Sequence, residues 1–267
     1  MPLAVCATPI GNLEDVTLRV LRELQEADLV LCEDTRHTRR LLERHGIDAR
    51  LLSYHEHNEA QRTAEVLPRL EAGERVALVS DAGLPAISDP GARLVAAARE
   101  ADVPVTVLPG PSAVETALVA SGFGTDRFQF LGYLPRGSGE RRALWNEVAR
   151  RPWALVAFES PQRVGSSLAS LAEVLPDRPV AVCRELTKRY EEVVRGSARE
   201  LAERFSQGAK GEITIVIGPA EVDVGDEAPA LDAVGELVAG GLSRRSAADV
   251  VARLTGLPRN RLYRGSL

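Results

Sequence analysis

The sequence predicts a fold of the α/β class, with two α/β domains in succession and a small helical extension after them. Three observations support this prediction. Short apolar runs alternate with amphipathic segments in the first 110 residues, a second set of apolar runs follows with fewer helical patterns between them, and the last 26 residues carry six arginines against one acid. With 267 residues, 45% of them hydrophobic, the chain is long enough to bury a core in each domain.

The first part of the chain has the pattern of a parallel sheet covered by helices. Its candidate strands are LAVCA (3–7), DLVLC (28–32), RVALVS (75–80) and VTVL (105–108). Helical patterns separate them at about 16–27, 36–45, 58–72 and 91–101. Such alternation places the functional loops at the carboxyl ends of the strands. We assign residues 1–111 to an N-terminal α/β domain.

The second part of the chain, residues 112–220, is expected to form a C-terminal α/β domain. Its candidate strands are FQFLGYL (128–134), WALVAF (153–158), PVAVC (179–183), YEEVV (190–194) and EITIVIG (212–218). Because few helices separate the later strands, an antiparallel or mixed sheet is favoured here.

The end of the chain is divided by charge. Residues 221–231 lie in an acidic stretch and are assigned to a linker, whereas residues 232–267 are assigned to a basic helical extension of two or three short helices, with Ser243 as an N-cap. The net charge of −5 argues against a protein that coats nucleic acid, but the basic extension allows phosphate contacts. The alternative is that the arginines of the extension have no phosphate-binding role and simply stand where other proteins use lysine, since this chain has only two lysines.

Several classes of protein are disfavoured by what the sequence lacks. No apolar run approaches the roughly 20 residues of a membrane helix, and no leader pattern is present, so we expect a cytoplasmic protein with no membrane contact. Cys6, Cys32 and Cys183 stand singly in apolar runs and are expected in the core. His55 and His57 lack a third clear ligand, so no metal is expected.

Three loops rich in glycine and proline follow predicted strands: TPIGN (8–12), SDAGLPAISDPG (80–91) and PGPSA (109–113). Neither GxGxxG nor GxxxxGK[ST] occurs, which disfavours a Rossmann dehydrogenase and a P-loop enzyme. Glycine permits close backbone approach and proline fixes the chain path, so such loops present rigid backbone groups to a ligand. One loop alone is usually a turn, but three at the same sheet edge predict a binding site.

These loops also carry a resemblance to a known family. TPIGNLEDVT, LCEDTRHTRRLL, VSDAGLPAISDPG, LPGPSA, FQFLGYLP and KGEITIVIGP resemble, in order and spacing, the bacterial enzymes that methylate the 2'-hydroxyl of a cytidine in 16S ribosomal RNA. That family looks like a branch of the tetrapyrrole methylases. The resemblance implies a tetrapyrrole-methylase-like fold, S-adenosylmethionine in a trough between the two α/β domains, a small-subunit ribosomal RNA or 30S particle as the substrate, and a homodimer.

The resemblance also implies which residues hold the cofactor. They are Pro9, Ile10 and Gly11; Ser80, Asp81, Ala82, Gly83, Pro85 and Ile87; Ser112 and Ala113; Phe158 and Glu159; and Glu212, Ile213 and Thr214. Such residue types offer the apolar contacts and hydrogen bonds that adenine and ribose need. A carboxylate that follows a strand, such as Asp81, is as often a turn former as a ligand.

Methyl transfer to a ribose hydroxyl requires alignment of the acceptor oxygen and favours a nearby base or cation. Candidate substrate-binding residues are Arg36, His55, Asn58, Glu59, Arg184 and Lys188. Each also fits a solvated surface, and the resemblance assigns no general base. The arginines at 36, 39, 40 and 44, at 136, 141 and 142, and in the extension are candidate phosphate contacts.

Two other functions stay open at this point. One is a methyltransferase of the same fold that acts on a precorrin or another small tetrapyrrole, which would have no evident need for the basic extension. The other is a non-catalytic RNA-binding assembly factor, which intact cofactor loops disfavour.

Overall fold

The computed structural model describes residues 2–220 and 227–266. The chain divides into two compact units, Met1–Pro219 and Ala220–Leu267. The first unit contains both α/β domains and the second contains the C-terminal helices, so each unit is described by itself.

The N-terminal domain is a parallel sheet with helices on both faces, as predicted. Its strands are β1 Leu3–Cys6, β2 Leu29–Cys32, β3 Leu51–Ser53, β4 Val76–Val79 and β5 Val105–Leu108, in the order β3-β2-β4-β1-β5. Every pairing is parallel. Strand β3 was not predicted, because it has only three half-buried residues.

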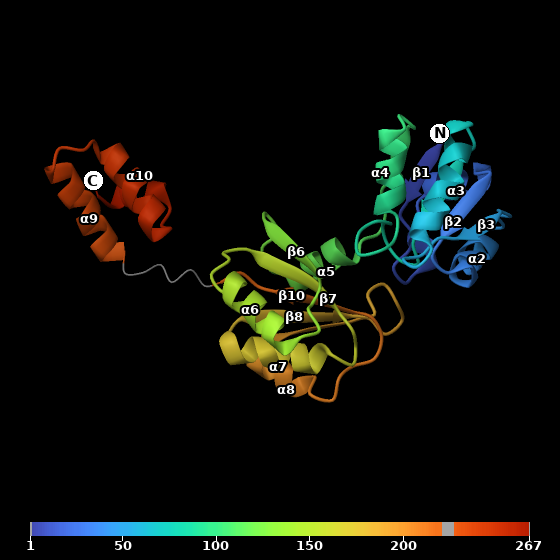
Figure 1. The fold of residues 1–267 in the computed structure, drawn as a ribbon. Helices are drawn as coiled ribbons and strands as arrows, with labels where there is room; N and C mark the ends of the chain where they lie inside the picture. Colours follow the sequence, from blue (N-terminus) through green and yellow to red (C-terminus); the bar gives the residue numbers. More distant parts are fainter. Residues whose placement is uncertain (1, 221–226, 267) are drawn as a thin grey trace. The chain divides into compact units, whose positions relative to one another are not determined.

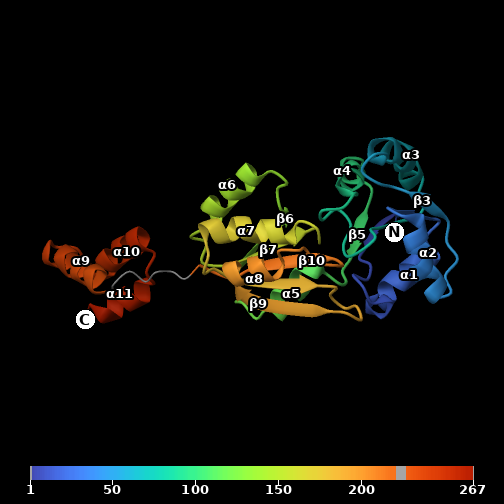
Figure 2. The ribbon, with the colours of Figure 1, turned by 90° about the horizontal axis from the view of Figure 1, so that it is seen from below.

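The side chains of these strands alternate between two apolar layers. One layer packs against helices α1 Leu18–Glu26 and α2 Thr35–Arg44, after a short 3-10 helix at Leu13–Asp15. The other packs against α3 Glu59–Glu71 and α4 Ala92–Glu100. Figure 2 shows the two helix pairs on opposite faces of the sheet. Burial on both faces explains why the strands appear in the sequence as continuous apolar runs.

The second α/β domain has a mixed sheet. Its strands are β6 Phe128–Tyr133, β7 Ala154–Glu159, β8 Pro179–Arg184, β9 Glu192–Ser197 and β10 Ile213–Ile217, in the order β6-β7-β10-β8-β9. Only β6 and β7 pair in parallel, and β10 runs antiparallel to both of its neighbours. The strand predicted at 190–194 corresponds to β9, which begins two residues later, at Glu192.

Helices cover both faces of this second sheet, more of them than the sequence pattern indicated. Helix α5 Ala113–Ser121 packs on one face. Helices α6 Ser138–Val148, α7 Val164–Val174 and α8 Ala198–Arg204 pack on the other, and Figure 1 shows α5 and α7 on opposite sides. The three cysteines are buried and unpaired, as expected of core residues.

The C-terminal unit consists of three helices with an apolar core of their own. They are α9 Glu227–Ala239, α10 Arg244–Thr255 and α11 Arg259–Gly265. The predicted N-cap is confirmed, because the Ser243 hydroxyl accepts a hydrogen bond from the Ser246 N–H. Residues 221–226 of the predicted linker lie outside the described residues, and its last residues, from 227 onward, belong to α9. Among the described residues, no helix is both long enough and apolar enough to span a membrane.

Candidate functional site

A cavity of about 390 Å³ lies where the N-terminal loops meet the second sheet. Strands β1, β4 and β5 are parallel, so the loops that follow them emerge at one sheet edge. Most residues that the resemblance assigns to the cofactor line this cavity: Ile10, Asp81, Ala82, Gly83, Ile87, Ser112, Ala113, Phe158, Glu159, Glu212, Ile213 and Thr214. The remaining four, Pro9, Gly11, Ser80 and Pro85, lie in the same loops but do not line it.

The long loop at 80–91 is tied to the first loop by backbone hydrogen bonds. Thr8 and Gly83 exchange two, from Thr8 N–H to the Gly83 carbonyl at 2.8 Å and from Gly83 N–H to the Thr8 carbonyl at 3.1 Å. Ala86 and Ser88 adopt left-handed backbone with φ of 71° and 61°. Non-glycine residues hold such angles only where the surrounding structure enforces them, and they are often found at functional sites. They flank Ile87, which lines the cavity.

Two aspartates give the N-terminal wall of the cavity its charge. The carboxylate of Asp81 accepts a hydrogen bond from the N–H of Asp34, the residue that caps α2, at 3.1 Å. Asp89 is half-buried, and burial together with the nearby Glu33 carboxylate raises its pKa to about 6. Burial, and then Asp81, likewise raise the pKa of Glu33. This wall therefore concentrates negative charge that is only partly compensated.

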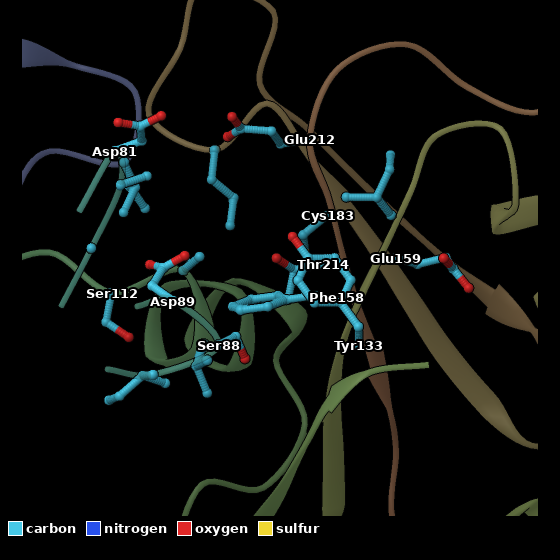
Figure 3. A pocket seen from close by; sticks show the side chains of 18 of the residues that line it. Asp81, Ser88, Asp89, Ser112, Tyr133, Phe158, Glu159, Cys183, Glu212 and Thr214 are labelled. Atoms are coloured by element: carbon cyan, nitrogen blue, oxygen red, sulfur yellow. The ribbon is translucent and has the colours of Figure 1, made fainter. Parts of the chain in front are cut away.

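The opposite wall is apolar and aromatic. Because β10 runs antiparallel to β7 and β8, its first residues lie beside the last residues of those strands: Thr214 pairs with Phe158 and with Cys183. The Phe158 and Tyr133 rings meet edge to face, 5.5 Å between centroids. Figure 3 shows Asp81, Asp89 and Ser112 on one side of the cavity, with Phe158, Cys183 and Thr214 on the other.

Glu159 lines the cavity, but its carboxylate is already engaged. It forms an ion pair with Arg163 at 2.5 Å and accepts hydrogen bonds from the Ser167 hydroxyl at 2.5 Å and from the Ser160 N–H at 2.7 Å. The side chain is fully buried, and Figure 3 shows it directed away from the other labelled side chains. Glu159 therefore has a structural environment rather than a ligand-facing one.

None of the six residues expected to bind the substrate lines the cavity. Arg36 is 87% exposed and pairs with Asp34. Arg184 pairs with Glu192 on the neighbouring strand and donates to the Lys210 carbonyl, which is a structural role.

The other substrate candidates also contact protein groups. Glu59 accepts hydrogen bonds from the N–H groups of Gly91 and Arg93, so it braces the end of the long loop. Asn58 accepts from the His55 N–H at 2.8 Å and lies 3.1 Å from its ring nitrogen Nε2. Lys188 forms two ion pairs, to Glu185 and Glu212. No group of three possible metal-ligating side chains occurs among the described residues.

Sequence reasoning missed several residues that line the cavity: Leu84, Ser88, Asp89, Val114, Tyr133, Ser160, Pro161, Cys183, Leu186 and Gly211. For some a signal was present, because Ser88 and Asp89 belong to the SDAGLPAISDPG loop, Tyr133 to FQFLGYLP and Gly211 to KGEITIVIGP. Asp89 is the main omission, because it is a half-buried carboxylate in the cavity wall whose pKa is raised, as is common for groups that bind ligands.

The matches to known proteins cover nearly the whole chain. The family model of the tetrapyrrole (corrin/porphyrin) methylases matches residues 2–202, and that of the RsmI C-terminal HTH domain matches residues 225–265. A protein of Micromonospora olivasterospora called ribosomal RNA small subunit methyltransferase I is 47% identical over 98% of this chain and 85% of its own length. A Thermotoga maritima protein of the same name is 44% identical over 82% of this chain and 99% of its own length.

Solved structures support the fold. The methyltransferase CobJ superposes with a TM-score of 0.64 at 22% identity, covering 82% of this chain and 94% of its own. A uroporphyrin-III-C-methyltransferase of Thermus thermophilus does so with a TM-score of 0.59 at 23% identity, covering 81% and 93%. At these identities the likeness concerns the fold alone.

Proposed function

We propose that this chain, which belongs to the ribosomal RNA small subunit methyltransferase I family of the tetrapyrrole methylases, methylates the 2'-hydroxyl of a cytidine in small-subunit ribosomal RNA. It is an S-adenosylmethionine-dependent methyltransferase. Relatives at 39–47% identity over nearly the whole chain carry the ribosomal RNA name. This favours RNA over a small tetrapyrrole as the acceptor.

The observation that carries the cofactor assignment is the composition of the cavity. Among the described residues that line it there is no lysine or arginine, and of its four carboxylic acids Glu159 is paired with Arg163 and Glu212 with Lys188, which leaves Asp81 and Asp89 to face a ligand. S-adenosylmethionine supplies an electrophilic methyl group on a positively charged sulfonium. A cavity of this charge, with an aromatic wall and a volume within the usual range for small-ligand sites, fits a cation that carries a flat heterocycle.

The residues present would divide the cofactor between the two walls. Asp81 and Asp89 would face its positive charges, since opposite charges attract strongly in a partly enclosed site. Phe158 and Ile213 would contact the adenine, and the backbone of the loop at Ser112 and Ala113 would supply hydrogen bonds. The enzyme's main task is then to hold the acceptor oxygen in line with the methyl carbon.

The RNA would be held by arginines outside the cavity. Helix α2 exposes Arg36, Arg39, Arg40 and Arg44, and its capping residue Asp34 contacts Asp81 of the cavity wall. In the C-terminal unit, α10 and α11 carry six arginines against Asp249. Arginine is suited to phosphate oxygens because it donates two parallel hydrogen bonds. We propose both surfaces as phosphate contacts of the RNA or 30S particle.

The direct test is methyl transfer. Purified full-length protein, tritiated S-adenosylmethionine and 30S particles from cells that lack this activity should give one labelled 2'-O-methylcytidine, identified by nuclease digestion and mass spectrometry. Naked small-subunit RNA and a precorrin serve as parallel acceptors. Label in the precorrin with none in RNA or particles would transfer the assignment to the small-molecule class, and RNA binding without cofactor binding would indicate an assembly factor.

We also propose that the protein is a cytoplasmic homodimer, since ribosomal RNA is cytoplasmic in bacteria and the first unit leaves several apolar side chains exposed. Strand β5 ends its sheet, and Val107 on it is 49% exposed. Leu18 and Val119 are 79% and 70% exposed. A second copy covering these side chains would remove apolar surface from water. Sedimentation analysis should show a dimer that Val119→Glu weakens.

A further inference from the structure

The turn between β8 and β9 is held in an unusual backbone conformation. Within four residues, Glu185 and Thr187 both adopt left-handed angles, with φ of 52° and 63°. Neither residue is glycine, so the surroundings must stabilise the turn. Residues 185–188, which we call the clasp, make contacts on two sides that provide this stabilisation.

On one side the clasp contacts the first loop of the N-terminal domain. The Thr187 hydroxyl accepts a hydrogen bond from the Asn12 N–H at 3.0 Å. Gly11 lies so close that an added Cβ would be 2.5 Å from Lys188 Cγ and 2.7 Å from the Leu186 carbonyl. Only glycine allows this approach, which explains the need for Gly11 although it does not line the cavity.

On the other side the clasp contacts the start of β10. Glu185 Oε1 accepts hydrogen bonds from the Glu212 N–H and from Lys188 Nζ, each at 3.0 Å. Lys188 Nζ also lies 3.0 Å from Glu212 Oε2. Gly211 adopts a φ of 85°, and a Cβ there would overlap the Glu185 carboxyl group. One ammonium is therefore shared by two carboxylates across the base of this loop.

The charges of the clasp are stable near neutral pH. The hydrogen bond from the Glu212 N–H, followed by the contact with Lys188, lowers the pKa of Glu185. Burial works to lower the pKa of Lys188, but its hydrogen bonds to Glu185 and Glu212 outweigh burial and raise it. Glu185 and Lys188 therefore remain an ion pair.

The clasp joins opposite parts of the cavity wall. Leu186 of the clasp lines the cavity, as do Ile10 next to Gly11 and both Gly211 and Glu212. Since the first loop belongs to the N-terminal domain and Glu212 to the second, the clasp contacts both walls of the cavity.

We propose that Lys188 is a positioning residue for the cofactor: by sharing its ammonium between Glu185 and Glu212 while its stem packs on Gly11, it fixes the spacing of the two walls. The proposal rests on the proposed function, because it takes the cavity to be the S-adenosylmethionine site. It assigns Lys188 to cofactor binding rather than to contact with RNA.

The chain has only two lysines, Lys188 and Lys210, which permits a direct observation. Lysine labelled with ¹⁵N and ¹³C in the full-length protein gives two side-chain signals, assigned by Lys210→Arg. Addition of S-adenosylmethionine should shift the Lys188 signal and leave that of exposed Lys210 in place. A Lys188 signal that stays fixed at saturating cofactor would overturn the proposal.

Variants test the same idea by affinity. Lys188→Met should raise the Kd for S-adenosylmethionine about tenfold, as expected for loss of about one charge-assisted contact, and leave the KM for 30S particles at saturating cofactor unchanged. Lys188→Arg should restore binding to within about threefold of wild type, since it keeps the charge. The matched control Lys210→Met should bind as wild type does.

Each outcome bears on a separate claim. The positioning role would be refuted if the wild type binds S-adenosylmethionine and Lys188→Met binds it with the same Kd. It would also be refuted if Lys188→Met binds the cofactor normally but has a raised KM for 30S particles. Absence of S-adenosylmethionine binding by the wild type would instead refute the proposed function. If Lys188→Met fails to fold, the spectroscopic titration of the wild type and the Lys188→Arg affinity still decide the question.

Discussion

The two walls of the cavity differ in chemistry and in the way the chain builds them. The N-terminal wall consists of loops after parallel strands and holds the acids Asp81 and Asp89. The opposite wall consists of strand ends: antiparallel pairing brings Ile213 of β10 beside the end of β7, which holds Phe158, and Tyr133 lies next to Phe158 on the parallel strand β6. A ligand with a cationic centre and a flat heterocycle satisfies both walls at once. If this division is correct, variants of the two walls should respond differently to the charge of the ligand.

The largest expected effect comes from removing charge in the acidic wall. Asp89→Asn keeps the shape of the side chain and should raise the Kd for S-adenosylmethionine about 30-fold, since a hydrogen bond to a charged group contributes about 2 kcal/mol. Titration calorimetry measures it, with Asp48→Asn, at an exposed position in the same domain, as the control. An unchanged Kd would mean that the acidic wall does not hold the cation.

The same carboxylate should make binding depend on pH. With a pKa of about 6, Asp89 is ionised at pH 7 and mostly protonated at pH 5. Affinity for the cationic cofactor should therefore fall about tenfold as the pH drops from 7 to 5, because protonation removes the negative charge. Calorimetry across this range should give a sloping profile for the wild type and a flat one for Asp89→Asn. A flat wild-type profile contradicts the assignment.

The aromatic wall should be insensitive to the charge of the ligand. Phe158→Ala should weaken binding about tenfold, in line with the contribution of one stacked base. The loss should be equal for S-adenosylmethionine and for its product, in which the sulfur is a neutral thioether, whereas Asp89→Asn should affect the product less. Phe158→Leu, which retains apolar contact, controls for packing. If Phe158→Ala and Asp89→Asn change the ratio of the two Kd values, for S-adenosylmethionine and for its product, by the same factor, then the two walls do not have separate roles.

The smallest effect concerns the RNA surface beyond the acidic wall. The double variant Arg39→Ala, Arg40→Ala on α2 should raise the KM for 30S particles about fivefold. The slope of log affinity against log salt concentration should become shallower by the amount expected for about one to two lost phosphate contacts. Cofactor affinity should not change. Arg199→Ala, on the exposed side of α8, is the control. Loss of cofactor affinity in the double variant would show that α2 acts on the cavity instead.

Burial explains which elements the sequence revealed. Strands β1 and β4 are buried along their whole length, so they stand out as apolar runs. Helix α5 did not stand out, because Val119 on its exposed face is apolar and obscures the helical period. Helix α7 has a similar difficulty, since its sequence VGSSLASLAEV has small residues where polar ones would mark the solvent face.

Local sequence patterns predict one side of the site only, whereas the residues of the other side, such as Phe158 and Thr214, came from the family resemblance. Parallel strands force their loops to one edge, so the grouping of the loops at 8–12, 80–91 and 109–113 follows from the alternation of strands and helices. The opposite wall depends on β10 pairing with β7, about 60 residues away in the chain, which no local pattern indicates. The clasp requires Gly11 to meet Lys188, a contact that only the folded chain creates.

The self-contained core of the C-terminal helices has an evolutionary consequence. The apolar cluster of that unit draws its residues from Ala230 to Leu262, and the clusters of the first unit draw none from this range. A chain that ended at the boundary between the two units, or that carried a different segment after it, would leave the apolar core of the first unit unchanged. The Thermotoga maritima relative, matched over 99% of its length by 220 residues, has the size that such a change produces. The helical unit can therefore be removed or replaced without exposing the apolar clusters of the first unit.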